Sequence, residues 1–125
     1  VTFPHNVSNL AVRLYAPSTS MWISGEVYIG ATYSNGNASG FRQYDFTHNM
    51  NSGTNYNSTT NEIASRGSTS SHFELNGHGW DSNEGAHYWE FRHTASSGNT
   101  IYVQFETFGS GLAYPASWYY RHTTY

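Results

Sequence analysis

Apolar residues along this 125-residue chain recur at every second position, not at every third or fourth. Between residues 9 and 15, for example, Leu10, Val12 and Leu14 share one face. Arg13 and Tyr15 fall on the opposite face. Such alternation is typical of a β-strand with one buried side. Because no window of a dozen residues has the apolar spacing of an amphipathic helix, the sequence predicts an all-β fold.

Turn signals divide the chain into several such strands. Gly25 and Gly30 indicate a bend or bulge in the second strand. Two segments rich in glycine and small polar residues, 48–61 and 76–85, are predicted to be loops. Short strands separated by turns favour one antiparallel β-sandwich domain over residues 1–125, of the jelly-roll kind. The predicted strands are 9–15, 21–33, 41–46, 71–75, 86–93 and 100–108.

The composition is unusual because aromatic residues, at 18%, outnumber charged ones, at 10%. Lysine is absent, the five arginines are spread along the chain, and the formal net charge is -3. Binding to nucleic acid depends on clustered basic side chains, so this composition argues against a nucleic-acid partner. Flat rings among Ser, Thr, Asn and Gly instead suit sugars and the headgroup region of lipids.

The absence of cysteine removes disulfides, thiol catalysis and cysteine metal sites together. The chain begins at Val1, without an initiator Met and without a signal-like segment. This start fits a processed N-terminus, and we expect a secreted or extracellular protein. No apolar run reaches the length of about 18 residues that a membrane-spanning helix needs.

The densest aromatic group lies near the C-terminus. Rings at a loop or strand end can stack on a sugar or enter a lipid interface. Alternation along a strand would instead send about half of them into the core. We expect at least one of these rings to be exposed for binding, whereas the mid-strand rings Trp22 and Trp89 are expected in the core. The group consists of Tyr114, Trp118, Tyr119, Tyr120 and Tyr125.

The glycine-rich segment 76–85 is a second candidate site. Trp80, Asp81 and Asn83 place a ring, a carboxylate and an amide close together, with Asn76 a few residues before them. Hydroxyl pairs of sugars are bound by groups of this kind. The sequence therefore predicts a sugar site in this segment.

Metal-binding signatures are weak. Asp81–Gly85 has a superficial likeness to a calcium loop, but it lacks the third oxygen position and the terminal bidentate Glu. His72, His78 and His87 lie nearby at spacings that are not those of a zinc site, and no H-E-x-x-H pair is present. We predict neither a metal nor a cofactor.

Catalytic signatures are equally weak. No G-x-S-x-G elbow is present. Glu74, Glu90 and Glu106 could supply a carboxylate pair for glycoside hydrolysis, but each occupies an alternating strand position where a lone Glu usually faces water. Nothing in the sequence shows that any two of them approach each other. We therefore expect a protein that is not an enzyme.

Two segments carry a resemblance to a known family. The first is Leu10-Ala11-Val12 followed by Trp22, Tyr28 and Tyr33. The second is Gly85-Ala86, then Ser97-Gly98-Asn99-Thr100-Ile101, then Val103, Phe105, Tyr114 and Trp118-Tyr119. Together they resemble the actinoporin-like β-sandwich superfamily, which holds the sea-anemone pore-forming actinoporins and the mushroom fruit-body lectins. The resemblance implies a sandwich with an aromatic end.

Departures from the family pattern affect the expected function. The chain starts almost at its first predicted strand, without the amphipathic N-terminal helix that actinoporins insert into membranes. Glu106, Phe108 and Gly111 stand where the phosphocholine pocket of the family has Ser, Pro and Tyr. The basic patch of the family is missing as well. The resemblance therefore points to the lectin branch more than to the toxin branch.

These observations favour a non-enzymatic lectin that binds glycans or glycoconjugates. Single sites of this kind are weak, so a symmetric homo-oligomer would supply avidity. The alternative is a membrane-lipid-binding protein related to cytolysins, which would dock through Tyr114, Trp118, Tyr119 and Phe108. For the lectin, the candidate rings are Trp80, Tyr114, Trp118 and Tyr119, and the candidate polar groups are Asn76, Asp81, Asn83 and Arg121.

Overall fold

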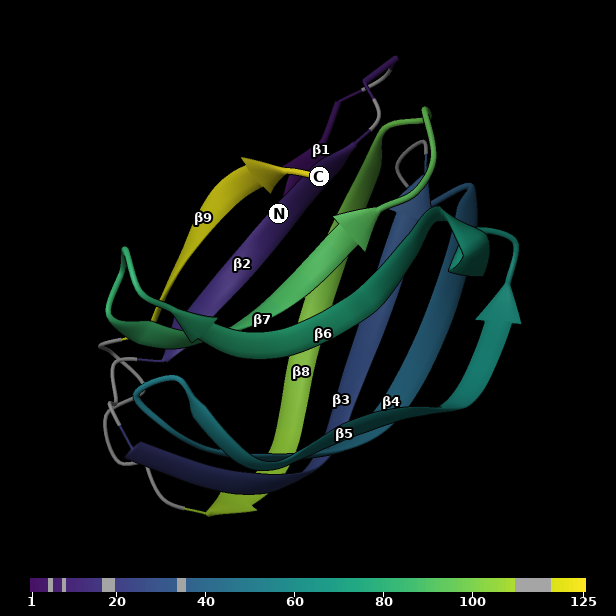
Figure 1. Cartoon of the computed structure of the whole chain (residues 1–125). Coiled ribbons are helices and arrows are strands. Elements are labelled where there is room, and N and C mark those ends of the chain that lie inside the picture. The colour runs from purple at the N-terminus through teal and green to yellow at the C-terminus, as the bar shows by residue number, and fades with distance from the viewer. Residues whose placement is uncertain (5, 8, 17–19, 34–35, 110–117) are drawn as a thin grey trace.

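The alternating strands pack as two antiparallel sheets that face each other across one core (Figure 1). The computed structural model describes residues 1–4, 6–7, 9–16, 20–33, 36–109 and 118–125. Sheet A has the strand order β1-β8-β3-β4-β5, and sheet B has the order β6-β7-β2-β9. The strands of sheet A are β1 (Thr2–Phe3), β8 (Asn99–Gly109), β3 (Ser20–Tyr33), β4 (Ala38–Asn51) and β5 (Thr54–Gly67). Those of sheet B are β6 (Phe73–Asp81), β7 (Ala86–His93), β2 (Leu10–Ala16) and β9 (Tyr119–Thr124). The predicted all-β sandwich is confirmed.

One face of each long strand supplies the core, as the alternation predicts. Val27 and Ile29 of β3 are fully buried, and so is Trp89 of β7, which was expected there. Trp22 was expected in the core as well, and that prediction is wrong. Its neighbours Met21 and Ile23 point inward, so Trp22 lies on the outer face of sheet A and is 51% exposed.

The segment 48–61, predicted to be a polar loop, is instead the end of β4, a tight turn and the beginning of β5. Ser52 and Gly53 both have positive φ angles, 42° and 92°, which is the conformation of a two-residue hairpin turn. The sequence hid β5 because this edge strand consists of small polar residues that are mostly exposed, so no apolar alternation marks it.

The segment 76–85 was predicted to be a loop throughout. Its first part is instead a strand, because β6 continues to Asp81. A bulge between Leu75 and Gly77 interrupts its pairing with β7. By contrast, β3 passes through Gly25 and Gly30 in continuous register with β4 and β8, so the bulge predicted there is absent from that strand. Gly25 nevertheless has a φ of +148°, a value that side chains disfavour.

Candidate functional site

Four side chains lie side by side across the outer face of sheet A. Glu26 of β3 lies directly opposite Glu106 of β8 and opposite Asp45 of β4, and Asp45 lies opposite Asn61 of β5. We call this row the acidic rung. Side chains paired in this way have Cβ atoms about 4.5–5.5 Å apart, and like charges at that separation repel. The fold therefore gathers three carboxylates that are far apart in the sequence.

Tyr28 joins two of these carboxylates. Its hydroxyl donates to Glu26 and lies 3.2 Å from Oε2 of Glu106. The hydrogen bond to Glu26, partial desolvation and the contact with Glu106 raise the pKa of Tyr28 above its ordinary value. The phenol therefore stays protonated and acts as a donor at the acidic rung.

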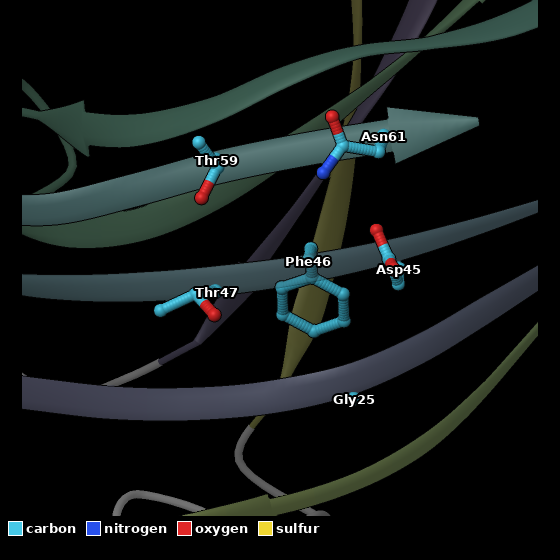
Figure 2. Close-up of a pocket in the computed structure, with 6 residues that line it drawn as sticks. All are labelled: Gly25, Asp45, Phe46, Thr47, Thr59 and Asn61. Atoms are coloured by element: carbon cyan, nitrogen blue, oxygen red, sulfur yellow. The ribbon is translucent and has the colours of Figure 1, made fainter. Parts of the chain in front are cut away.

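A polar cavity of about 260 Å³ opens beside the acidic rung (Figure 2). Its lining comes from β3, β4 and β5 and consists of Gly25, Asp45, Phe46, Thr47, Thr59 and Asn61. Figure 2 shows Asp45 and Thr47 on one strand beside Thr59 and Asn61 on the next, while Gly25 contributes no side chain. The cavity is slightly smaller than the range of about 300–1,000 Å³ that accommodates drug-sized ligands, so it suits a small ligand or one unit of a longer one.

Aromatic rings flank the acidic rung on both sides along the strands. Trp22 and Phe108 contact each other edge to face, with ring centroids 6.2 Å apart, and Phe108 is 63% exposed. On the other side, the rings of Tyr28 and Phe41 lie 6.3 Å apart. At a rise of about 3.3 Å per residue, Trp22 lies roughly 13 Å along β3 from Glu26.

The polar groups of this face have few protein partners. In the part of the chain that the structure describes, no hydrogen bond or ion pair is recorded for the side chains of Asp45 and Asn61. Polar atoms that the protein leaves unpaired are available to a ligand. Sequence reasoning missed both residues, because they lie in segments of ordinary polar character and become neighbours only through strand register.

The outer face of sheet B holds several of the residues that the sequence singled out, but it engages them internally. Glu90 accepts hydrogen bonds from Nε of Arg13 at 3.0 Å, Nε of Arg92 at 2.9 Å and Nδ2 of Asn76 at 3.0 Å. Arg13 also contacts Oδ2 of Asp81 at 3.2 Å. We call these five residues the arginine network. Its two arginines and two carboxylates balance in formal charge.

Asp81 acts as an internal acceptor at the end of β6. Its Oδ2 accepts from the hydroxyl of Tyr15 at 2.8 Å, and its Oδ1 accepts from the backbone N–H of Asn83 at 3.0 Å and of Glu84 at 3.3 Å. Burial opposes ionisation, but these hydrogen bonds and the charge of Arg13 hold the pKa of Asp81 below its ordinary value. The carboxylate therefore orders the β6–β7 turn, and the exposed Asn83 lies in that turn.

Tyr119 and Arg121 of β9 also have protein partners. Both contact the carboxylate of Glu84, at 2.9 Å for the Tyr119 hydroxyl and 2.7 Å for Nε of Arg121. The ring of Tyr119 stacks on Tyr15 with centroids 5.0 Å apart. Tyr15 is consequently buried, although its alternation placed it on the solvent side.

The rings expected to form an open platform are placed differently. Trp118, one of the candidate rings, is half-buried and stacks face to face on the core residue Trp89, with centroids 5.6 Å apart. In the described part of the C-terminal group, the exposed rings are instead Tyr120 and Tyr125. Trp80 points between the sheets, where it packs edge to face against His87 at 5.0 Å and under Gly53 of the β4–β5 turn. Tyr114 lies outside the described residues.

Three histidines meet between the two sheets. Nε2 of His48 and Nδ1 of His87 are 3.0 Å apart, and Nε2 of His78 is 3.1 Å from the hydroxyl oxygen of Thr60. Burial, together with the neighbouring imidazoles of His78 and His87, lowers the pKa of His48 to about 3. Burial also lowers the pKa of His78. Across the described residues, no group of three or more His, Asp or Glu is arranged to hold a metal ion.

The carboxylates considered for hydrolysis do not form a pair. Glu90 is buried in the arginine network on sheet B, whereas Glu106 stands on the outer face of sheet A, on the other side of the molecule. Glu74 lies opposite Arg92 on sheet B. The neighbour of Glu106 is Glu26, which no sequence motif singles out.

No protein-family model matches the chain, and no match was found among curated proteins or solved structures. The actinoporin-like resemblance therefore rests on the sequence motifs alone. Where the structure describes the chain, none of its helices is long and apolar enough to cross a membrane.

Proposed function

We propose that this protein is a non-enzymatic lectin that binds a glycan on the outer face of sheet A. The observation that carries the proposal is the acidic rung, in which the side chains of Asp45 and Asn61 have no partner among the described residues and which lies between two pairs of rings. Carboxylate, amide and hydroxyl groups accept and donate hydrogen bonds to sugar hydroxyls, and rings stack on the apolar faces of sugars. The site differs from the one that the sequence predicts, because Asp81, Asn76, Tyr119 and Arg121 already have internal partners on sheet B.

In the proposed complex, Trp22 and Phe108 stack on one sugar unit while Asp45 and Asn61 bind hydroxyls of a unit further along the same glycan. Each ring contact contributes about 1 kcal/mol beyond the area it buries. A single site of this kind is weak, and a symmetric homo-oligomer would raise the apparent affinity by avidity. Sedimentation at several protein concentrations would establish whether such an oligomer forms.

A glycan array followed by calorimetry on the best ligand tests this proposal. We expect Trp22→Ala and Asn61→Ala each to weaken binding about tenfold, which corresponds to the loss of about 1.4 kcal/mol. Both side chains are exposed, so both variants should fold. The matched control Arg121→Ala changes an exposed residue on sheet B and should bind like wild type.

Two results would contradict the proposal. One is an array on which nothing binds at high protein concentration. The other is a loss of binding in Arg121→Ala while Trp22→Ala binds like wild type. That result would place the binding site on sheet B.

The membrane alternative keeps one supporting observation, the exposed pair Phe108 and Trp22. The acidic rung beside this pair would repel anionic headgroups. Trp118 and Tyr119, which the alternative also requires, are engaged with Trp89 and Tyr15. Co-sedimentation with sphingomyelin vesicles that is lost in Phe108→Ser would favour the alternative over the lectin.

Hydrolysis is a further question because Glu26 and Glu106 share the Tyr28 hydroxyl, which keeps their oxygens within about 6 Å. Retaining glycosidases hold their carboxyl groups about 5–5.5 Å apart. Neither Glu, however, is among the described residues that line the cavity. We therefore propose binding without cleavage and expect no new reducing ends from a bound glycan on prolonged incubation.

A further inference from the structure

Among the described residues, no basic side chain is paired with the carboxylates of the acidic rung. Ion pairs occupy four of the five arginines, namely Arg13, Arg42, Arg92 and Arg121. The fifth, Arg66, lies opposite Phe41, four positions along β4 from Asp45, which is about 13 Å. That separation exceeds the Debye length of about 8 Å at physiological salt. The outer face of sheet A therefore presents concentrated negative charge.

This arrangement opposes folding, because like charges directly opposite each other destabilise a sheet. Among the described residues, the Tyr28 hydroxyl is the group that offsets part of this repulsion, because it donates to Glu26 and Glu106. It makes no such contact with Asp45. A cation bound over the rung would offset the repulsion among all three carboxylates. The described residues offer no group that could hold a metal ion, so an organic cation fits this face better.

The geometry points to a glycan with protonated amino groups, such as a glucosamine oligomer, as the ligand of this face; this inference rests on the proposed glycan-binding function. An ammonium group carries three donors, and carboxylates are its strongest acceptors. The flanking rings supply stacking surfaces for sugar units. The neighbouring cavity has uncharged hydrogen-bonding groups at Thr47, Thr59 and Asn61, which suit sugar hydroxyls.

A matched pair of probes tests the inference, because the glucosamine hexamer and the N-acetylglucosamine hexamer differ in charge at nitrogen. We expect calorimetry at about pH 6 to give at least tenfold tighter binding of the glucosamine hexamer than of the acetylated hexamer. Added salt should weaken that binding and leave binding of the acetylated hexamer nearly unchanged.

Variants that remove one carboxylate charge test whether the amino groups of the glucosamine hexamer bind at the acidic rung. Glu26→Gln and Glu106→Gln should each weaken binding of the glucosamine hexamer about tenfold and weaken binding of the acetylated hexamer by a clearly smaller factor. Glu74→Gln makes the same change of charge on sheet B and is the control, with both affinities expected at wild-type values. Circular dichroism of each variant verifies folding.

The outcomes separate the two proposals. Equal or tighter binding of the acetylated hexamer would overturn the selection for amino sugars while leaving glycan binding intact. Binding of neither hexamer, with no other glycan bound on the array, would overturn both. Oligolysine binding as tightly as the glucosamine hexamer would show that charge alone is recognised, and the amino-sugar inference would fail.

Discussion

At the scale of single residues, Gly25 shows how closely two strands of sheet A approach each other. A Cβ at this position would overlap the carbonyl oxygen of Glu106 and lie 2.8 Å from Cα of Thr107, and the φ of +148° is strained for other residues. A side chain here would therefore push β3 and β8 apart. Gly25 also lines the cavity beside the acidic rung.

We expect Gly25→Ala to lower the free energy of unfolding by about 3 kcal/mol. Gly30→Ala, on the same strand, is the control, because the nearest atom to an added Cβ there is the carbonyl oxygen of Gly40 at 4.0 Å. It should change stability by less than about 0.5 kcal/mol. Urea denaturation measures both, and equal effects would contradict the steric explanation.

The buried side chain of His48 leads to a second prediction at the scale of single residues. The pKa of His48 is about 3 in the folded protein, whereas an unfolded histidine titrates at 6.5. Protonation therefore favours the unfolded chain, so stability is complete above pH 6.5 and falls as the pH drops toward 3. One such group contributes about 1.4 kcal/mol per pH unit across this window.

We expect His48→Gln to flatten the decline in the free energy of unfolding between about pH 6.5 and 5, where carboxylates remain ionised. His122→Gln replaces an exposed histidine and should keep the wild-type slope. Denaturant titrations at a series of pH values provide the measurement. Parallel curves for His48→Gln and wild type would rule out His48 as the source of the slope.

At the scale of elements, the arginine network stabilises sheet B. Glu90 and Arg13 are directly opposite each other on β7 and β2, and Asn76 reaches Glu90 from β6. Burial opposes ionisation of Glu90, but hydrogen bonds and charge from Arg13 and Arg92 hold its pKa below the ordinary value. One carboxylate therefore ties three neighbouring strands together.

Glu90→Gln should lower the free energy of unfolding by about 2 kcal/mol, because two partly buried arginines lose the buried carboxylate that they contact. Glu74→Gln, on the same sheet, has no recorded partner to lose and should change it by less than about 0.5 kcal/mol. Glycan binding should persist in folded Glu90→Gln. A stability equal to wild type would show that the network is not a stabilising element.

The strands that could be predicted from the sequence are those in which every second side chain is apolar and buried. The strands at 9–15, 21–33, 86–93 and 100–108 match β2, β3, β7 and β8 closely. The edge strand β5 was missed, because exposure on both faces removes the selection for apolar residues that alternation depends on. The turn at Ser52 and Gly53 was the available signal, with small residues at both positions that need positive φ.

At the scale of the whole molecule, the two outer faces differ in electrostatic character. Sheet B pairs its charges within the arginine network and with Glu84, while sheet A leaves the acidic rung unpaired. Repulsion among unpaired carboxylates lowers the stability of the fold, and binding sites commonly carry such a cost in stability. Charge distribution between the faces, and not the net charge of -3, identifies the candidate site.

Glu106→Gln should therefore raise the free energy of unfolding by about 0.5 kcal/mol, since it removes one of two repulsive pairs across β3. Thermal and urea denaturation at low salt provide the measurement, and added salt should reduce the gain. If Glu106→Gln is less stable than wild type at low salt, the carboxylates of the acidic rung do not repel in the way we describe.

The sequence by itself determined the all-β class, the inward faces of the long strands and the lack of a basic surface. These are local properties, set by alternation along a strand and by composition. Only the tertiary structure decided that Glu26, Asp45 and Glu106 form one row, that Trp22 faces solvent and that Trp118 stacks half-buried on Trp89. Strand register determines which outward side chains become neighbours, and register depends on pairing between distant segments, which no single strand encodes.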